Sequence, residues 1–291
     1  MVTGAQGWLG SRVVERLSKP HKVTGLARSD VDCTDEAHLR SVLASLQPDI
    51  LLHLAGSTRH RSELNAMDAH WRDGVVATKN VLEVASAARV GHVILAGSME
   101  ELGDAPGVLT LDTPAKPLTE YGLSKSIARE FSDFIARTRE ARIDWFRPCA
   151  VYGPGQRGNM LVPTACEAAV RGTPARFTDG RQQRDFLFVD DLLRWVELLI
   201  DLRPTATGRL NLHHLGTGRA VAVRDVLEFI ASSVPTARFE IGALARRPQE
   251  PDVQIAPELS TDDPAIAVWR AEVPWEIGIK KTLDWWIGQS R

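Results

Sequence analysis

The chain lacks a surplus of charge of either sign. Its 291 residues include 35 basic and 37 acidic side chains, which gives a formal net charge of −2. A protein that binds nucleic acid or an anionic membrane surface through a broad positive field needs a basic excess. The composition therefore argues against both kinds of partner.

Long apolar runs and cysteines are also scarce. Every apolar run is far shorter than the ~18 residues that a membrane helix needs, and Met1-Val2 leads straight into a glycine loop, which is not a signal-peptide pattern. The three cysteines, which lack any C-x-x-C spacing, are Cys33, Cys149 and Cys166. This usage argues against a disulfide framework or a thiolate zinc site and predicts a cytoplasmic protein. The eight histidines show no ligand spacing, so we expect no metal.

The first half of the chain alternates strand-like and helix-like segments. Strand-like apolar runs occur at Lys22–Ala27, Asp49–Leu54, His92–Ala96 and Ile143–Phe146. Helical patterns, including one at the end of the chain, occur at Leu9/Val13/Leu17, Ala37–Leu46, Leu64–Ala88, Glu120–Arg139 and Ile277–Ile287. Strands that alternate with helices predict an α/β fold with a doubly wound parallel sheet.

The pattern changes after Tyr152-Gly153-Pro154-Gly155, where prolines become frequent and elements shorten. We therefore predict a sheet domain over residues 1–152 and a smaller C-terminal lobe over residues 153–291. Two later runs, Phe186–Val189 and Leu210–Leu212, could return strands to the sheet, so parts of about 183–213 could belong to the first domain.

A glycine loop opens the first predicted helix. Residues 3–10 spell T-G-x-x-G-x-x-G. Such glycines permit a close approach of backbone to a pyrophosphate, and the helix N-terminus supplies N–H donors and a positive dipole. At a strand–helix junction this favours dinucleotide binding over an ordinary glycine-rich turn. The loop residues expected to contact the cofactor are Gly4, Gln6, Gly7, Trp8, Leu9 and Gly10.

The segment before this loop is short. Only Met1-Val2-Thr3 precede Gly4, whereas a buried strand normally spans ~5–6 residues. We hypothesise that the natural start lies several residues upstream.

The second predicted strand bears on the type of dinucleotide. In dinucleotide folds an acid about 20 residues past the loop binds the ribose 2′-hydroxyl of NAD, whereas an arginine accommodates the 2′-phosphate of NADP. Here Ala27 stands where the acid would be, and Arg28 follows. This favours NADP. The alternative is that Arg28 is a surface charge and Asp30 does the work of the acid, which leaves NAD possible.

A tyrosine and a lysine share one helix face. Tyr121 and Lys125 lie at i and i+4, and a nearby cation lowers the pKa of a phenol, which prepares it to exchange a proton with a carbonyl or alcohol. Ser98 ends a predicted strand, where its hydroxyl could donate to a carbonyl oxygen. The alternatives are a surface pair and a structural serine.

Together these motifs resemble the extended short-chain dehydrogenase/reductase family over nearly the whole chain. The resemblance implies a Rossmann domain that binds NAD(P), with Ser98, Tyr121 and Lys125 as catalytic residues, the last two also contacting the cofactor. The segments that resemble family motifs are Thr3–Gly10, Asp32–Asp35, His53–Gly56, Ser98–Gly103, Arg147–Gly155, Arg184–Asp191 and Arg247-Pro248. Further implied cofactor contacts are Asp32, Cys33, Leu54, Ala55 and Gly56.

The resemblance also implies a nucleotide-diphosphate sugar as substrate, with Arg184 and Arg247 as a clamp on its diphosphate. Three positions depart from the family pattern. Gly74 replaces the asparagine of N-x-x-G-T, Ala150 replaces the asparagine of R-P-x-N, and Leu102 replaces the tyrosine of Y-G. The first change puts the family's water-linked proton relay in doubt, and the second alters the substrate pocket.

The preferred interpretation is an oxidoreductase that reduces a 4-keto-(6-deoxy) nucleotide sugar with NADPH. One alternative is a 4-epimerase or a 4,6-dehydratase that recycles NAD, and Glu100 stands where the family's dehydratases carry a catalytic acid. Another is a non-catalytic NAD(P)-binding regulator. The long helices 64–88 and 120–139 resemble the family's dimer helices, so we predict a homodimer.

Overall fold

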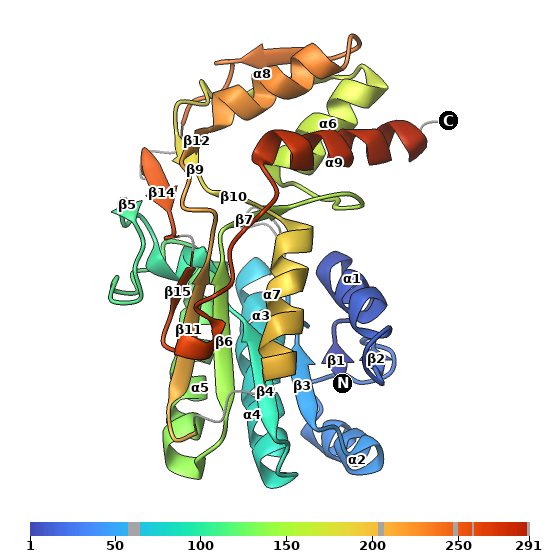
Figure 1. The fold of residues 1–291 in the computed structure, drawn as a ribbon, viewed down its shortest axis with the longest axis vertical. Coiled ribbons are helices and arrows are strands. Elements are labelled where there is room, and N and C mark those ends of the chain that lie inside the picture. The colour runs from blue at the N-terminus through green and yellow to red at the C-terminus, as the bar shows by residue number, and fades with distance from the viewer. Residues whose placement is uncertain (58–64, 203–206, 247–249, 258, 290–291) are drawn as a thin grey trace.

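The computed structural model describes residues 1–57, 65–202, 207–246, 250–257 and 259–289. One seven-stranded sheet with helices on both faces fills the lower part of the molecule, and a smaller layer of helices and short strands covers its upper end (Figure 1). No helix in the described ranges is both long and apolar enough to cross a membrane.

The large sheet is parallel except at one edge. In spatial order its strands are β15 (Leu259–Thr261), β11 (Leu210–Leu215), β6 (Ile143–Pro148), β4 (His92–Ala96), β3 (Ile50–His53), β1 (Val2–Thr3) and β2 (Gly25–Leu26). Only β15 pairs antiparallel, with β11. The order reverses at β1, because β2 lies on one side of it and β3 on the other. The predicted doubly wound α/β fold is confirmed, and such a reversal creates a ligand crevice at the strands' carboxyl ends.

Helices cover the two faces of this sheet through separate apolar cores. The helices that pack on one face are α2 (Glu36–Leu46), α4 (Ala77–Ala87) and α5 (Glu120–Arg139). Those on the other face are α1 (Trp8–Leu17) and α7 (Val189–Leu202). Each helix turns its buried residues toward the sheet, as in α7, where Trp195 is fully buried against Phe146 of β6.

The limits of α2 and α5 follow from local capping. Asp35 accepts the N–H of His38 at 3.0 Å, and Thr119 accepts the N–H of Gly122 at 2.9 Å. Such side chains satisfy N–H groups that a helix start leaves without partners. α5 ends at Glu140, which adopts a left-handed conformation.

The predicted helix over residues 64–88 is not regular throughout. It consists of α3 (Ala66–His70), a π-helical segment η1 (Trp71–Val76) and α4. Gly74 lies inside η1, where a Cβ atom would come within 3.0 Å of the Ser124 Oγ on α5. Close packing of η1 on α5 thus depends on a residue without a side chain, and π-helical turns occur frequently at functional sites.

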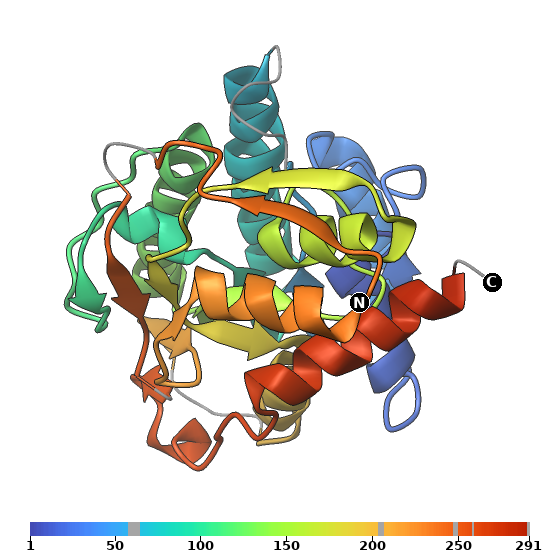
Figure 2. The same ribbon diagram turned by 90° about the horizontal axis from the view of Figure 1, so that it is seen from above.

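The upper layer is built from short elements, seen from above in Figure 2. Its helices are α6 (Leu161–Arg171), α8 (Val223–Ser233) and α9 (Trp275–Gln289). Its strands are β8 (Pro174–Phe177) with β13 (Arg238–Ile241), β7 (Ala150–Tyr152) with β10 (Phe186–Phe188), and β12 (Val221–Ala222), β9 (Gln183–Arg184), β14 (Val253–Ile255) and β5 (Gly107–Val108) in one sheet. The remaining short helices are η2 (Met99–Leu102) and η3 (Pro264–Ile266).

The two runs expected to return to the sheet behave differently. Leu210–Leu212 belongs to β11, which pairs with β6 in the large sheet. The expectation for Phe186–Val189 is wrong, because Phe186–Phe188 forms β10, which pairs with β7 in a separate two-stranded sheet. All three residues of β10 are buried in the core that the upper layer shares with α7. Two strands of the large sheet, β11 and β15, come from beyond residue 153, and a division into two domains there stays a prediction.

Candidate functional site

The glycine loop joins the end of β1 to the start of α1. Gly4 adopts a φ of +73°, and a Cβ atom there would lie 2.6 Å from the backbone nitrogen of Ala55. The Gly7 N–H closes the turn by donating to the Gly4 carbonyl at 2.9 Å. Only glycine at position 4 allows the loop to approach the end of β3 this closely.

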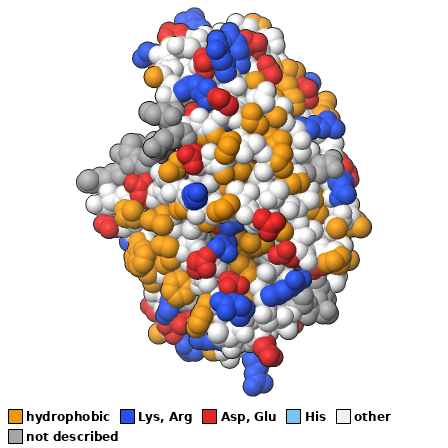
Figure 3. Space-filling model, turned by 90° about the vertical axis from the view of Figure 1, so that its left-hand side faces the viewer, with side chains coloured by type: hydrophobic (Ala, Val, Ile, Leu, Met, Phe, Trp, Pro, Cys, Tyr) orange, Lys and Arg blue, Asp and Glu red, His pale blue; other side chains and the backbone are white. Residues whose placement is uncertain are grey.

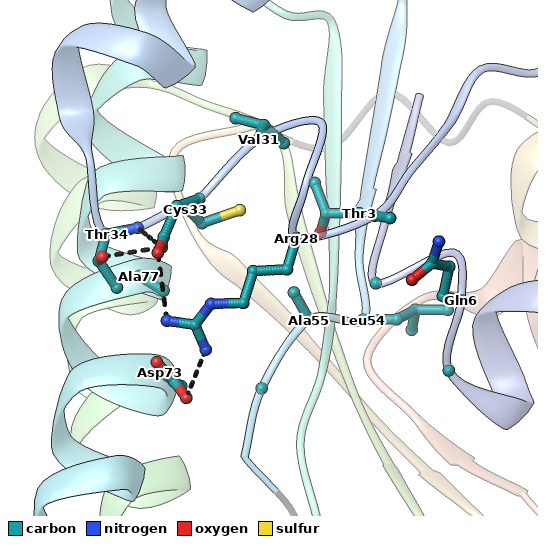
Figure 4. Close-up of a pocket in the computed structure, with 15 residues that line it drawn as sticks. Thr3, Gln6, Arg28, Val31, Cys33, Thr34, Leu54, Ala55, Asp73 and Ala77 are labelled. Carbon is teal, nitrogen blue, oxygen red and sulfur yellow. Dashed lines mark hydrogen bonds and ion pairs between the residues drawn. The ribbon is translucent and has the colours of Figure 1, made fainter.

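A pocket of about 230 Å³ lies at the carboxyl ends of β1, β2 and β3 (Figure 4). It is smaller than the ~300–1,000 Å³ of a typical small-molecule site, so it would take only part of a dinucleotide. Predicted cofactor residues that line it are Gly4, Gln6, Gly7, Arg28, Asp32, Cys33, Leu54, Ala55 and Gly56. Strand ends, a glycine without Cβ and the N-terminus of α1 together fit the nucleotide part of NAD(P).

The other three loop residues predicted to bind the cofactor lie outside the pocket lining. The indole Nε1 of Trp8 donates to the Pro154 carbonyl at 2.9 Å. Leu9 packs against the apolar core on the α1 face. Gly10 is buried, and a side chain there would collide with the backbone of Gly4. Trp8 instead joins α1 to the chain that follows β7.

Charges around the pocket neutralise one another. The Arg28 guanidinium lies 3.0 Å from Asp73 Oδ2 and 3.1 Å from Asp32 Oδ2, and Figure 4 shows it reaching across toward η1. Asp73 also pairs with Arg72 at 2.8 Å. Hydrogen bonding to Asp73, ahead of that to Asp32, raises the pKa of Arg28. Asp30, the alternative acid, accepts the Ala27 N–H at 2.8 Å and closes its own turn.

Ser98, Tyr121 and Lys125 meet beyond the carboxyl end of β4. Ser98 follows β4 and begins η2, and its Oγ accepts the Glu100 N–H at 3.1 Å. Lys125 Nζ lies 5.8 Å from the centre of the Tyr121 ring and donates to the Ala96 carbonyl at 2.7 Å. The structure therefore brings the three predicted catalytic residues together.

Burial dominates the proton equilibria of this group. It raises the pKa of the Tyr121 phenol, the carboxylates of Glu100 and Glu101 raise it further, and a hydrogen bond from Ser98 opposes them. Lys125, which was expected to lower this pKa, is not among the groups that shift it. Burial also lowers the pKa of Lys125 to about 8. Glu100 itself is exposed, and its carboxylate accepts the Thr119 hydroxyl at 2.6 Å.

The family model described as "NAD dependent epimerase/dehydratase family" matches residues 1–211. The chain belongs to this family, within the extended short-chain dehydrogenase/reductases. A UDP-glucose 4-epimerase of Mycolicibacterium smegmatis is 27% identical and is covered over 99% of its length by 100% of the chain. A dTDP-glucose 4,6-dehydratase of Neisseria meningitidis is 26% identical over 99% of the chain and 92% of its own length.

Solved structures agree with this assignment. MoeE5 in complex with UDP-glucuronic acid and NAD is 27% identical, with a TM-score of 0.83 over 100% of this chain and 99% of that one. The chain is therefore similar to NAD-dependent nucleotide-sugar epimerases and dehydratases. These relatives fit the epimerase or dehydratase alternative better than the preferred NADPH ketoreductase.

The departures from the family pattern have visible consequences in this family member. Position 74 has no side chain, and the Gly74 carbonyl accepts the Thr78 hydroxyl at 2.6 Å. Because glycine has no side chain, no proton relay can run through a side chain at this position. An asparagine there would also come close to Ser124. Leu102, the last residue of η2, is fully buried. Ala150 lies in β7, and its N–H donates to the Asp185 carbonyl at 3.0 Å.

The predicted substrate clamp is only partly described. Arg184 of β9 pairs with Glu250 at 3.0 Å and donates to the Pro251 carbonyl at 3.0 Å. Arg247 lies outside the described residues. The clamp therefore stays a prediction.

Sequence reasoning missed three side chains of this region. Asp73 lines the pocket, the buried His70 ring stands edge-on to Tyr121 with centres 5.6 Å apart, and Glu101 is buried behind Ser98. For Glu101 a signal was present, because Ser98 and Glu101 form the S-x-x-E spacing of a capping box. His70 and Asp73 carry no such local signal.

Proposed function

We propose that this protein is a nucleotide-sugar 4-epimerase that uses NAD and keeps it through turnover. The observation that carries the proposal is the grouping of Ser98 and Lys125 around Tyr121, beside a pocket whose glycine loop suits a dinucleotide. Bound NAD would supply a hydride acceptor and, in the second half of the reaction, a hydride donor.

Each residue of this group has a role in that reaction. Tyr121 removes the proton of the sugar hydroxyl during oxidation and returns it to the carbonyl oxygen during reduction. Ser98 donates a hydrogen bond to the same oxygen. Lys125, with its pKa lowered to about 8 by burial, binds the ribose of the cofactor.

The charges at Arg28 favour NAD over NADP. A 2′-phosphate needs an uncompensated cation, whereas Arg28 already pairs with the carboxylates of Asp73 and Asp32. Asp73 and Asp32 would also repel a phosphate dianion. We therefore replace the expected NADP with NAD in this proposal.

The substrate in this proposal is a UDP-sugar, because the epimerase relative is named for UDP-glucose and MoeE5 is seen with UDP-glucuronic acid. Arg184 would bind the diphosphate bidentately in exchange for Glu250. Arg247 would complete the clamp.

A 4,6-dehydratase is the second candidate because of Glu100. Its carboxylate lies close enough to Tyr121 to raise the pKa of the phenol. Its hydrogen bond from Thr119 at 2.6 Å, however, ties it to the start of α5. Because this hydrogen bond already occupies the Glu100 carboxylate, we favour the epimerase over the dehydratase.

Turnover without added cofactor separates these interpretations. Purified protein would be incubated with UDP-glucose, UDP-glucuronic acid or dTDP-glucose, and products followed by proton NMR. A 4-epimerase yields the C4 epimer, and a 4,6-dehydratase yields the 4-keto-6-deoxy sugar. Reduction of an added 4-keto sugar only when NADPH is supplied would instead restore the ketoreductase interpretation.

We also propose a homodimer through α3, η1 and α5. Leu123, Phe131 and Phe134 share one face of α5, and they are exposed by 40%, 40% and 52%. Met67 and Trp71 on the adjacent α3 and η1 are exposed as well. Figure 3 shows hydrophobic side chains gathered on the side of the molecule where α5 lies. Light scattering should give twice the mass of the 32.0 kDa chain, and Phe134→Glu should halve it, whereas a monomeric wild type would contradict the proposal.

A further inference from the structure

A buried carboxylate lies directly behind the catalytic serine. The side chain of Glu101 is fully buried, and its Oε1 accepts the Ser98 N–H at 2.9 Å and the Trp145 indole N–H at 3.1 Å. Its Oε2 accepts Arg147 Nε at 2.8 Å and Nη2 at 2.7 Å. Four N–H donors therefore hold one carboxylate, and Arg147, which donates twice to the same oxygen, supplies its counter-charge.

This arrangement determines what the serine hydroxyl can do. Ser98 and Glu101 form a reciprocal capping box, in which Ser98 Oγ accepts the Glu100 N–H while Glu101 accepts the Ser98 N–H. Ser98 Oγ accepts the Glu100 N–H, and its hydroxyl can still donate to the Tyr121 phenol, whose pKa a hydrogen bond from Ser98 lowers. Glu101 accepts the Ser98 N–H and so fixes the backbone that carries this hydroxyl. The orientation of this donor thus depends on Glu101.

Neighbouring residues keep Glu101 in place. Gly97 lacks a Cβ atom, and any side chain there would enter the space of the Trp145 indole and the Glu101 carboxylate. Arg147 Nη1 also donates to His214 Nε2 at 3.1 Å. In turn, His214 Nδ1 donates to the Leu109 carbonyl at 2.8 Å. The Leu109 N–H donates in turn to Ile255 of β14 at 2.8 Å. The chain of contacts therefore runs from the serine to the lobe that carries Arg184.

We propose that Glu101 is a positioning residue for the reaction, which, held by Arg147, aligns the Ser98 hydroxyl with the reacting oxygen at Tyr121. The inference rests on the proposed function only for its kinetic readout. The groups that face Tyr121 are Glu100 and Glu101 from η2, His70 from α3, and Ser98 and Lys125. Of these, Glu101 is the one that bonds the backbone of the serine.

A matched pair of double variants tests this role. Removing one partner of a buried ion pair leaves an uncompensated charge, so both variants carry Arg147→Met. Glu101→Gln in this background keeps an oxygen that can accept the Ser98 N–H, and Glu101→Met removes it. Glu167→Gln, which takes a carboxylate from an exposed Glu–Arg pair on α6, serves as the control.

The expected result is a difference between the two double variants. The double variant that carries Glu101→Met should lose about 10- to 100-fold in kcat, with KM and NAD affinity within about 3-fold of wild type, because small misplacements of catalytic groups cost that much. The double variant that carries Glu101→Gln should stay within about 3-fold of the kcat of wild type. Equal kcat values in the two double variants would overturn the inference, even with wild-type epimerase activity intact.

A second readout needs no substrate. The chain has two tyrosines, so ¹³Cζ-labelled tyrosine gives two NMR signals, and Tyr121→Phe assigns them. The Tyr121 signal should move in the Glu101→Met double variant, which loses the hydrogen bond from Ser98. It should stay near its wild-type position in the Glu101→Gln double variant and in the Glu167→Gln control. If wild type shows no turnover, the proposed function fails while this signal still decides the role of Glu101: an unmoved signal overturns it.

Discussion

The pocket at Arg28 and the predicted catalytic group at Tyr121 lie at neighbouring strand ends, but the ion pairs of the first are partly exposed and the ion pair behind the second is buried. Arg28 is 56% exposed, and its partners Asp32 and Asp73 are 39% and 14% exposed. Glu101 and Arg147 are 0% and 3% exposed. Exposed pairs contribute about 0–1 kcal/mol to stability, whereas breaking a buried pair costs about 3–5 kcal/mol. The pocket can therefore alter ligand preference at little cost in stability, and the catalytic group cannot.

The largest expected effect is on the catalytic side. Tyr121→Phe removes the proton-transfer group and should lower turnover by at least ~10²-fold. NAD affinity, measured by calorimetry, should stay within about 3-fold of wild type, because the pocket that fits the nucleotide part of the cofactor is lined by other residues. Turnover equal to wild type would remove Tyr121 from the mechanism.

Among the features of the pocket, we expect only the backbone at Gly4 to matter strongly for the stability of the fold. Gly4→Ala combines a φ of +73° with a Cβ placed 2.6 Å from the Ala55 nitrogen, and should reduce the free energy of unfolding by about 2–3 kcal/mol. Gly242→Ala, with a φ of +95° and open space around it, carries only the conformational strain and should cost about 1 kcal/mol. Equal losses in urea unfolding would show that the approach to β3 does not matter.

The pocket charges should affect ligand choice more than stability. Asp73→Asn frees Arg28 from one partner and removes a repelling carboxylate, so NADP affinity should rise about 5- to 10-fold while NAD affinity changes by less than about 2-fold. Asp68→Asn, on the exposed side of α3, is the control. An unchanged NADP affinity, measured by calorimetry, would refute the role of Asp73.

The smallest effect concerns pH. Burial lowers the pKa of Lys125 from 10.5 to about 8. Between these two pH values the unfolded chain binds more protons at this residue than the folded one, so stability rises as pH increases from about 8 toward 10. Lys125→Met should lack this rise. Urea unfolding of wild type and variant at about pH 8 and about pH 9.5 checks it, and identical pH slopes would contradict the shift.

Features that depend on near neighbours in the chain could be predicted well. The helix over Glu120–Arg139 and the strand over His92–Ala96 match α5 and β4 residue for residue, because apolar periodicity and capping act within a few positions. The Tyr121–Lys125 spacing likewise placed both side chains together. The glycine loop could be predicted from the sequence because its turn depends only on Gly4 and Gly7, which are close in the chain.

Features that depend on distant partners could not be predicted. Arg28 suggested NADP, and its ion pair with Asp73, 45 residues away, could not be read from neighbouring positions. The Trp8 indole turned to Pro154, 146 residues away. The run at Phe186 paired with β7 rather than with the large sheet.

The sequence by itself determined the parallel α/β fold and the glycine loop, and it predicted the three catalytic side chains, because short-range periodicity, caps, glycines and the Tyr121–Lys125 spacing are local signals. Only the tertiary structure decided which charges remain available: Arg28 is paired, and Glu101 is fixed behind Ser98 by Arg147, 46 residues on. The physical reason is that an ion pair between strand ends forms only after the crossovers have set those ends side by side.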